Sequence, residues 1–417
     1  MQLQNLDSNS DTCELPESQP LPLVSAPADG LPEIVVTDAA LRDTIAAIKA
    51  GTGPVALDAE RASGFRYRQR AYLIQLRRHG SGTHLIDPTA FDDLNDLNSA
   101  LHGVDWILHA ASQDLVCLAE LGLRPSAQLF DTELAGRLLG LARVGLGPLV
   151  EAQIGVSLAK EHSAADWSTR PLPEPWLNYA ALDVEYLIEL WALLEAALIE
   201  TTKYEWALQE FEHVKNSTVA IERVDAWRRT SGMHKLHTSR ELAVVREVWQ
   251  QRDVLARSLD TAPGRMLPDA AIVALAASQS QDRNVLLALP EMKHRYSRRN
   301  QETWIQSVVS AHALSEADLP PVRVKSGGPP PPRNWMPRHP QAFAALENAK
   351  EAVAALSESV SIPVENLMTP DHIRRIMWDG ASSIEDVHES LRDLHARTWQ
   401  IDLVAPLIWS ALEANPR

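Results

Sequence analysis

The sequence is poor in cysteine, and this scarcity excludes two kinds of scaffold. Cys13 and Cys117 are the only cysteines among its 417 residues. A disulfide framework needs several cysteine pairs, and a structural zinc site of the cysteine type needs closely spaced cysteines, unlike Cys13 and Cys117. Neither scaffold is available to this chain, so its chemistry has to come from other side chains.

Long apolar runs are also missing. No stretch of the sequence approaches the roughly 18 apolar residues from which a membrane span is recognised. Residues 1–30 lack the basic start and the apolar core of a secretory signal. The sequence therefore predicts a protein of the cytoplasm without membrane contact, and no feature of it predicts a protein partner.

Positive charge is scarce. The chain has 39 Lys and Arg against 55 Asp and Glu, which gives a formal net charge of -16. This balance argues against indiscriminate binding to nucleic acid through overall charge. It does not exclude a nucleic-acid substrate, because metal ions and local basic patches can meet the phosphates.

The chain divides into segments that differ in composition and in the periodicity of their apolar residues. Residues 1–30 are rich in Ser, Pro and acids without Lys or Arg, so a disordered acidic tail is expected. Residues 31–213 alternate between strand-like and helix-like segments, which predicts an α/β fold with a mixed sheet. Strands are expected at 55–57, 71–76, 83–87 and 106–109, and helices at 37–50, 112–121, after Asp131-Thr132 and as one long helix at about 175–200.

Only helical periodicity remains after about residue 213. A connector at 214–234 is expected to lead into a small helical domain at 235–317. The Pro- and Gly-rich stretch at 318–340 predicts a stiff linker. A second helical domain at 341–417 loosely echoes the first, which suggests a diverged repeat.

The clearest chemical signal is the run Val55-Ala56-Leu57-Asp58-Ala59-Glu60. In an extended backbone, residues two apart point to the same side, so Asp58 and Glu60 converge. Converging carboxylates repel each other unless a positive charge lies between them. Hard cations such as Mg²⁺ or Mn²⁺ take oxygen ligands of this kind. The alternative is a strand end that carries solvated acids.

Two further segments supply groups that could join this pair. Asp114 lies in the first turn of an expected helix, where the helix dipole favours a carboxylate. Stabilisation of that helix terminus is the alternative role. Tyr179 and Asp183 are four residues apart in an expected helix, so they present a phenol and a carboxylate on one face. The alternative is a solvated Asp on an amphipathic helix.

Together, Asp58, Glu60, Asp114, Tyr179 and Asp183 resemble the acid set of the DEDD superfamily of 3′-5′ exonucleases, in its tyrosine-bearing branch. The segments at 73–76, 85–88, 130–132, 166–167 and 170–172 look like those of the ribonuclease D family. This resemblance implies a ribonuclease H-like exonuclease domain at 31–213. It also implies an HRDC domain at 235–317 and a second HRDC-like domain at 341–417. One departure is Arg61, where the family commonly has an aromatic or aliphatic residue.

The resemblance implies a mechanism with two divalent cations, Mg²⁺ or Mn²⁺, about 3.5–4 Å apart. Asp58 would bridge them, Glu60 and Asp183 would hold the first, and Asp114 would act on the second through water. Tyr179 would orient the attacking water. The implied function is a 3′-5′ exoribonuclease that trims stable RNAs such as tRNA precursors and releases nucleoside 5′-monophosphates. A DNA 3′-5′ exonuclease and a catalytically silent RNA-binding scaffold are the alternatives.

Basic residues gather at the two ends of the first helical domain, and they predict a patch for the RNA backbone, with a solvated face as the alternative. They are Arg228, Arg229, Lys235, Lys293, Arg295, Arg298 and Arg299. Residues 31–213 are expected to carry the reaction alone, with the helical region holding RNA.

Three other residues have structural or accessory interpretations. Asp131 is interpreted as a helix N-cap and Cys117 as a core residue. Trp335, in the expected linker, could stack on a base.

Overall fold

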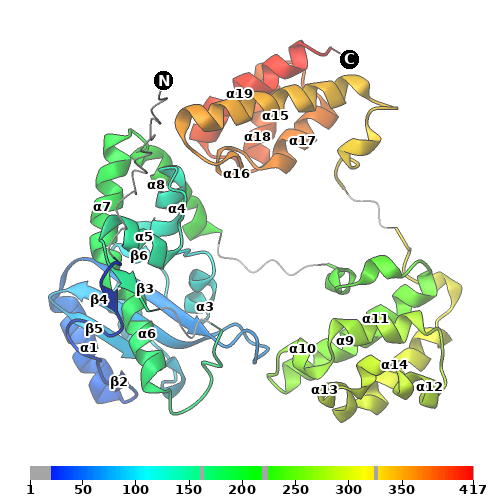
Figure 1. The fold of residues 1–417 in the computed structure, drawn as a ribbon, viewed down its shortest axis with the longest axis horizontal. Coiled ribbons are helices and arrows are strands. Elements are labelled where there is room, and N and C mark those ends of the chain that lie inside the picture. Colours follow the sequence, from blue (N-terminus) through cyan, green and yellow to red (C-terminus); the bar gives the residue numbers. More distant parts are fainter. Residues whose placement is uncertain (1–19, 160–163, 218–223, 324–326, 417) are drawn as a thin grey trace, which may run out of the picture.

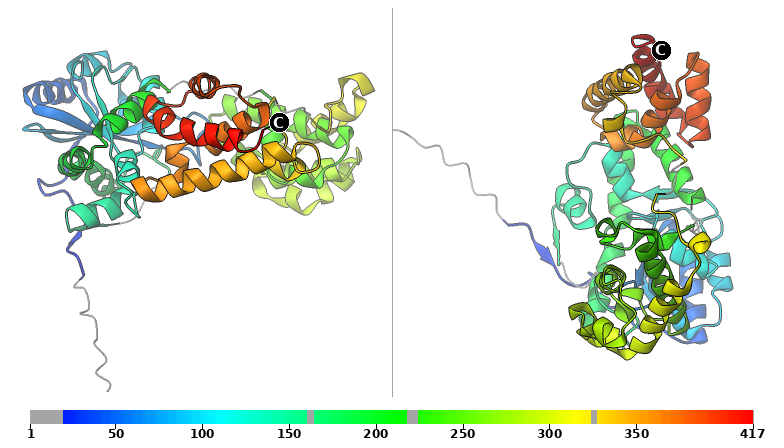
Figure 2. Two further views of the ribbon diagram at one scale, coloured as in Figure 1. Left: turned by 90° about the horizontal axis from the view of Figure 1, so that it is seen from above. Right: turned by 90° about the vertical axis from the view of Figure 1, so that its right-hand side faces the viewer.

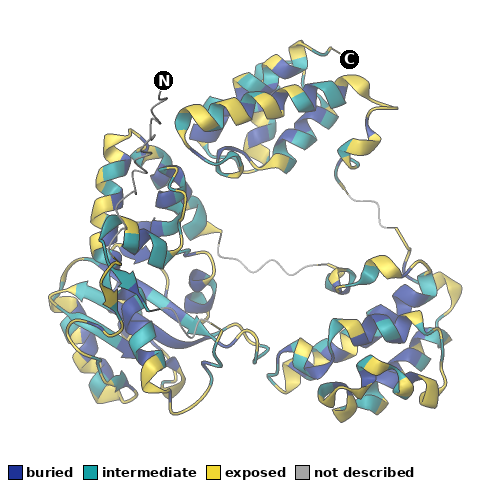
Figure 3. Cartoon of the chain, viewed as in Figure 1, coloured by how far each residue is buried: buried dark blue, intermediate teal, exposed yellow. Residues whose placement is uncertain are grey.

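The computed structural model describes residues 20–159, 164–217, 224–323 and 327–416. Within them, an α/β domain is followed by two all-helical domains, and no strand occurs among the described residues after 224 (Figure 1). Buried residues line the inner faces of the elements in all three domains (Figure 3). No helix in these described ranges has both the length and the apolar character needed to cross a membrane.

The α/β domain is built on a mixed sheet, as the sequence predicts. Its six strands run in the order β2-β5-β4-β3-β6-β7. β3 pairs antiparallel with β4 and parallel with β6, and apolar residues fill its buried half because both faces of the sheet are covered. The strands are β2 (Ile34–Val35), β3 (Thr52–Arg61), β4 (Ala71–His79), β5 (Gly82–Ile86), β6 (Trp106–Leu108) and β7 (Leu129–Asp131).

Helices surround this sheet, and the first has the ends that the sequence predicts. The hydroxyl of Thr37 accepts a hydrogen bond from the amide of Ala40, and Gly51 ends the helix. The helices of the domain are α1 (Asp38–Ala50), α2 (Asn95–Ala100), α3 (Asp114–Glu120), α4 (Thr132–Leu138), α5 (Leu146–Gln153), α6 (Glu174–Glu185), α7 (Leu187–Glu200) and α8 (Tyr204–Asn216), with a 3₁₀ turn η1 (Pro88–Ala90).

The single long helix expected at about 175–200 is wrong. The chain breaks at Tyr186, whose φ and ψ of -104° and 0° leave the helical region, into α6 and α7. No Pro or Gly marks this break in the sequence. Tertiary packing sets it instead, because α6 lies against β4 and β5 whereas α7 lies against α4.

The disorder expected for residues 1–30 is wrong for the part that the structure describes. β1 (Leu23–Val24) pairs in parallel with β8 (Ser157–Leu158). The amide of Ala28 donates to Glu185, and Asp29 forms an ion pair with Arg77 at 3.3 Å. These partners hold a segment whose composition alone suggested disorder. Residues 1–19 lie outside the described residues.

The first helical domain is organised around the long helix α9 (Ser239–Ser258), which begins with a capping box between Thr238 and Glu241. Trp227 and Trp304 are buried in its core. The other elements are η2 (Ala226–Arg229), η3 (Met233–Lys235), α10 (Pro263–Met266), α11 (Asp269–Ala277), α12 (Arg283–Ala288), η4 (Pro290–Lys293), α13 (Arg295–Arg299), α14 (Gln301–Ala313) and η5 (Glu316–Asp318).

The C-terminal domain repeats the opening of the first. In both, a long helix leads to a one-turn helix and then to a Met-x-Pro-Asp sequence, at 266–269 and 368–371, where the next helix begins. This order supports the suggested diverged repeat. The elements are η6 (Pro332–Asn334), α15 (Pro340–Val360), α16 (Val364–Leu367), α17 (Pro370–Asp379), α18 (Ile384–Asp393) and α19 (Thr398–Glu413).

The role suggested for Trp335 in base stacking is wrong. The side chain is fully buried, its indole N–H donates to the carbonyl of Pro330 at 2.7 Å, and its ring lies 5.0 Å from that of Trp378. A large apolar ring is more stable in a core than in an exposed linker. The later part of the expected linker at 318–340 therefore packs onto the C-terminal domain.

Both helical domains contact the α/β domain. The first touches it through the loop at 62–70, which joins β3 to β4, and the C-terminal domain touches it through α8 (Figure 1). The right-hand panel of Figure 2 also shows the C-terminal domain above the first helical domain. The loop at 62–70 directly follows the strand that carries Asp58 and Glu60.

Candidate active site

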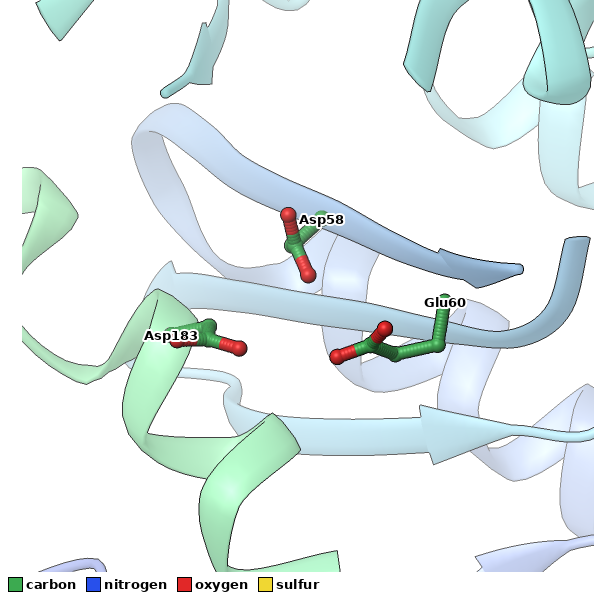
Figure 4. Close-up of side chains that lie close together, drawn as sticks. All are labelled: Asp58, Glu60 and Asp183. Carbon is green, nitrogen blue, oxygen red and sulfur yellow. The ribbon is translucent and has the colours of Figure 1, made fainter. Parts of the chain in front are cut away.

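The site is centred on the end of β3. Asp58 lies across from Gln75 of β4, and Glu60 lies across from Leu73, so both acids point to the same face of the sheet. Helix α6 covers this face. The last turn of α6 brings Asp183 over the strand, and the three carboxylates point toward one another (Figure 4).

One carboxylate oxygen from each of Asp58, Glu60 and Asp183 lies within 4.8 Å of the others. All three side chains are partly buried. The hydroxyl of Tyr179, one turn earlier in α6, donates a hydrogen bond to the carboxylate of Asp183. The structure thus brings together four of the five residues that the sequence singles out.

Asp114, the fifth residue, is buried in the first turn of α3. It lies outside the close group of three, although Asp58 raises its pKa and it raises the pKa values of Glu60 and Asp183. Asp114 is therefore an electrostatic neighbour of the group.

Asp131 positions the turn that carries Asp114. As expected, it caps α4 by accepting hydrogen bonds from the amides of Glu133 and Leu134. It also accepts from the amides of Ala110 at 3.0 Å and Ala111 at 2.9 Å, just before α3. The sequence indicated the cap but not this second role, since the two segments are about twenty residues apart.

The acid cluster is electrostatically strained without cations. Burial raises the pKa of Asp58 to about 6. Burial, and then the charge of Asp58, raise the pKa values of Glu60, Asp114 and Asp183 well above their ordinary range. A positive charge would relieve this repulsion. The donors are all oxygen atoms, which fits a hard divalent cation.

Cys117 is a core residue, as the sequence suggests, and His109 is half-buried. Burial lowers the pKa of His109 to about 4, and its ring shares a hydrogen bond of 2.9 Å with Thr132. The thiol of Cys117 is fully buried and donates to the carbonyl of Asp114 at 3.1 Å. Neither side chain has the properties of a nucleophile or a base at neutral pH.

Family models of known proteins match the three domains of the chain separately. A family model for a 3′-5′ exonuclease matches residues 32–199, one for an HRDC domain matches 241–308, and one for a 3′ to 5′ exonuclease C-terminal domain matches 328–412. The ribonuclease D of Shewanella sp. (strain ANA-3) is 31% identical over 332 residues, which are 78% of this chain and 81% of that protein. The chain belongs to the ribonuclease D family.

Solved structures agree with this assignment. A protein from Bifidobacterium adolescentis is 36% identical, with a TM-score of 0.86 over 94% of this chain and 100% of its own. Escherichia coli RNase D is 26% identical, with a TM-score of 0.68 over 92% of this chain and 99% of its own. The predictions of a mixed-sheet exonuclease domain, an HRDC domain and a 3′-5′ exoribonuclease are confirmed. The family implies the use of divalent metal, and the acidic cluster is the matching feature of this chain.

Family motifs that are distant in the sequence meet beside the site. Arg170 donates to both oxygens of Asp87, at 2.6 and 2.8 Å, and to the carbonyl of Tyr72 at 2.8 Å. Trp167 is fully buried under α6, with its ring 6.4 Å from that of Tyr179. These contacts fix the segment that leads into α6, and so they position Tyr179 and Asp183.

The predicted basic residues differ in their surroundings. Lys293, Arg295, Arg298 and Arg299 are exposed on η4 and α13. Arg229 and Lys235 are exposed on η2 and η3. Arg228 is instead engaged in contacts within its domain, because it lies 4.3 Å from the ring of Trp227 and forms an ion pair with Asp225 at 3.3 Å. It is therefore a weaker candidate for RNA.

No pattern in the sequence predicts the contact between the first helical domain and the loop at 62–70. Arg265 donates to the carbonyl of Gly64 at 2.8 Å and stacks 4.0 Å from the ring of Phe65. Tyr67 donates to Asp253 at 2.9 Å. Such contacts join residues about 190 positions apart, so no local pattern could reveal them.

Proposed function

We propose that Asp58, Glu60, Asp114, Tyr179 and Asp183 form the catalytic set of this exoribonuclease, with two divalent cations, Mg²⁺ or Mn²⁺. The observation that carries the proposal is the convergence of three carboxylate oxygens within 4.8 Å. Asp58, Glu60 and Asp183 would hold the cations directly, and Asp114 would act through water. The cations would activate the attacking water and stabilise charge on the entering and leaving oxygens.

The side chains themselves supply position and charge. Tyr179 keeps its proton at neutral pH, because burial and the charges of Asp183 and Glu60 raise its pKa. Its hydroxyl therefore acts as a hydrogen-bond donor that orients Asp183 and the attacking water, and not as a base. The products would be nucleoside 5′-monophosphates.

The substrate is proposed to be the 3′ end of a stable RNA such as a tRNA precursor, in the cytoplasm. The solved Escherichia coli relative is described as an exoribonuclease involved in structured RNA processing. The exposed cluster of Lys293, Arg295, Arg298 and Arg299 supports an RNA-holding role for the first helical domain, with Arg229 and Lys235 adding to it. Chemistry is thereby assigned to residues 31–213 and RNA holding to residues 235–317.

The test is to incubate full-length protein with 3′-labelled structured RNA, and with single-stranded RNA and DNA of matching sequence. Mg²⁺, Mn²⁺ and chelator are compared. We expect cleavage from the 3′ end of RNA that stops in chelator. Asp58→Asn and Asp183→Asn should each lower turnover by roughly 10²–10³-fold, and Tyr179→Phe by less.

Asp402→Asn, at an exposed position of α19, is the matched control and should cleave at the normal rate. If Asp58→Asn and Asp183→Asn cleave normally with unchanged circular dichroism, the assigned set is wrong. Equal cleavage of DNA and RNA would instead favour a general nuclease.

A further inference from the structure

Arg61 directly follows Glu60 in β3, at the point where the pairing with β4 becomes irregular. Glu60 lies across from Leu73, but Arg61 lies across from Ala71, so Tyr72 on β4 has no partner. In a regular strand Arg61 would point away from the face that carries Glu60. The extra residue Tyr72 makes a bulge on β4, which disrupts the ladder and increases the local twist beside Arg61.

Gln113 holds the guanidinium in its place. The Nη2 group of Arg61 donates to the Oε1 atom of Gln113 at 2.5 Å. Gln113 directly precedes Asp114, so Arg61 of β3 is tied to the residue beside the acid of α3. Its charge lowers the pKa values of Asp58, Glu60 and Asp114 against the effect of burial.

A cavity of about 490 Å³ opens beside this group. Its lining includes Glu60, Arg61, Gln113, Ser63, Gly64 and Gln69. Its volume lies within the range of sites for small organic ligands. A guanidinium has five N–H donors in a planar fork, and this fork suits the oxygens of a phosphate.

We propose that Arg61 binds a phosphate oxygen at the 3′ end of the RNA in this cavity, and that Gln113 positions its guanidinium. The inference rests on the proposed catalytic set, because the acids define where the reacting phosphate lies. The residue would thus add a fixed positive charge to a cluster that is otherwise acidic. It would attract the phosphate and at the same time repel the cations.

These two effects have opposite signs, and they provide the test. Full-length protein is titrated calorimetrically with Mg²⁺ alone, and then with adenosine 5′-monophosphate at saturating Mg²⁺. Arg61→Ala should weaken nucleotide binding by about 10- to 100-fold, and it should tighten Mg²⁺ binding by roughly 2- to 10-fold. Arg61→Lys keeps the charge but loses the fork, so Mg²⁺ binding should be unchanged while nucleotide binding weakens.

Gln113→Ala should weaken nucleotide binding less than Arg61→Ala does, and the double variant should be no worse than Arg61→Ala. Unchanged nucleotide binding by Arg61→Ala would overturn the inference. So would a loss of both Mg²⁺ and nucleotide binding, which would indicate a structural role. Asp58→Asn separates the two proposals: if it binds Mg²⁺ normally the catalytic set is wrong, whereas if only the Arg61 result fails, the set stands.

Discussion

The two helical domains attach to the exonuclease domain in different ways. The first contacts the loop at 62–70 through polar groups, most of them half-exposed. The amide of Ala262 donates to Phe65 and the amide of Arg68 donates to Asp260, both at 3.0 Å. Arg257 adds a hydrogen bond to the hydroxyl of Tyr67 at 3.1 Å. This loop lines the cavity beside Glu60, so the contact adjoins the reacting groups.

The C-terminal domain attaches through a buried surface on α8, which carries none of the site acids. The rings of Trp206 and Trp399 stack at 5.2 Å. Buried Glu210 accepts from Arg397 at 2.6 Å and from the indole of Trp399 at 2.9 Å. Lys203 donates to backbone carbonyls on both sides of this interface. The two domains share one continuous apolar core.

The difference suggests that the two interfaces have different roles. A buried interface with a shared core contributes to folding, whereas a small polar interface can form and open with little free energy. That residues 31–213 carry the reaction alone stays a prediction, but truncation is a poor test of it. Removal of residues 235–417 would expose the apolar surface of α8 and release the loop at 62–70. Point variants at each interface are therefore sharper tests than truncation.

The largest effect on stability is expected at the C-terminal interface. Glu210→Ala leaves the guanidinium of Arg397 and the indole of Trp399 without their acceptor, which should lower the free energy of unfolding by about 2–4 kcal/mol. The saturating cleavage rate should change less than twofold. Urea unfolding and single-turnover cleavage measure the two quantities. Glu212→Ala, on the same helix but paired at the surface with Lys215, is the control and should have little effect.

The first interface should show the opposite pattern. Arg265→Ala removes the hydrogen bond to Gly64 and the stacking on Phe65, so the loop beside Glu60 loses an anchor. We expect a loss of about 1–2 kcal/mol in stability. The saturating single-turnover rate should fall by about tenfold, because misplaced groups lower the rate. Arg283→Ala, whose partner Glu302 lies within the same domain, should leave the rate unchanged. A normal rate for Arg265→Ala would show that this interface does not affect the site.

The sequence predicts the site better than it predicts these interfaces. The spacing of Asp58 and Glu60 has the period of a strand, and the spacing of Tyr179 and Asp183 has that of a helix, so local geometry fixes each pair. The convergence of the pairs depends on tertiary packing and was available only through the family resemblance. In the same way, the cap made by Asp131 is local and was predicted, but its bonds to the turn before α3 were not.

The predictions from sequence that were wrong also have a common cause. The break at Tyr186 has no local breaker, and it arises because α6 and α7 pack on different surfaces. Trp335 lies in a Pro-rich segment that looks like a linker, but a buried site on the C-terminal domain takes its ring. The segment at 20–30 gains order from β8 and from Arg77. In each case a partner distant in the sequence outweighs the local composition.

A third prediction isolates the free energy of the acid cluster. The folded-state pKa of Asp58, about 6, is raised above its unfolded value. Its contribution to stability is therefore present at low pH and is lost as the pH rises through 6. Without metal at pH 7.5, Asp58→Asn should be more stable than wild type by about 1–2 kcal/mol after allowance for solvent screening. The difference should shrink toward pH 4.

Urea unfolding of both proteins in chelator, from pH 4 to pH 8, measures this difference. Mg²⁺ should reverse the order, because binding to the folded state stabilises wild type. Asp402→Asn, at its exposed position, serves again as the control and should follow wild type at every pH. If Asp58→Asn is no more stable than wild type in chelator, the acid cluster is not strained.

The smallest expected effect concerns RNA holding, and it tests which helical domain contacts the RNA. Arg298 and Arg299 are exposed on α13, which packs against α10, the helix of Arg265. Each phosphate contact that is lost should lower the salt slope of binding by about 0.7 for single-stranded RNA. The double variant Arg298→Ala/Arg299→Ala should therefore bind a few-fold more weakly at low salt and less so at high salt.

The matched control for this experiment lies on the other helical domain. Lys350 is an exposed cation on α15 that pairs with Glu347 at 2.7 Å, and Lys350→Ala should leave the salt slope unchanged. Binding is measured with the full-length Asp58→Asn protein, so that cleavage does not distort the titration. An equal change in slope for both variants would mean that the RNA lies across both helical domains. A change for Lys350→Ala alone would move the RNA to the C-terminal domain, and the polar interface at the loop would then have no role in delivering RNA to the site.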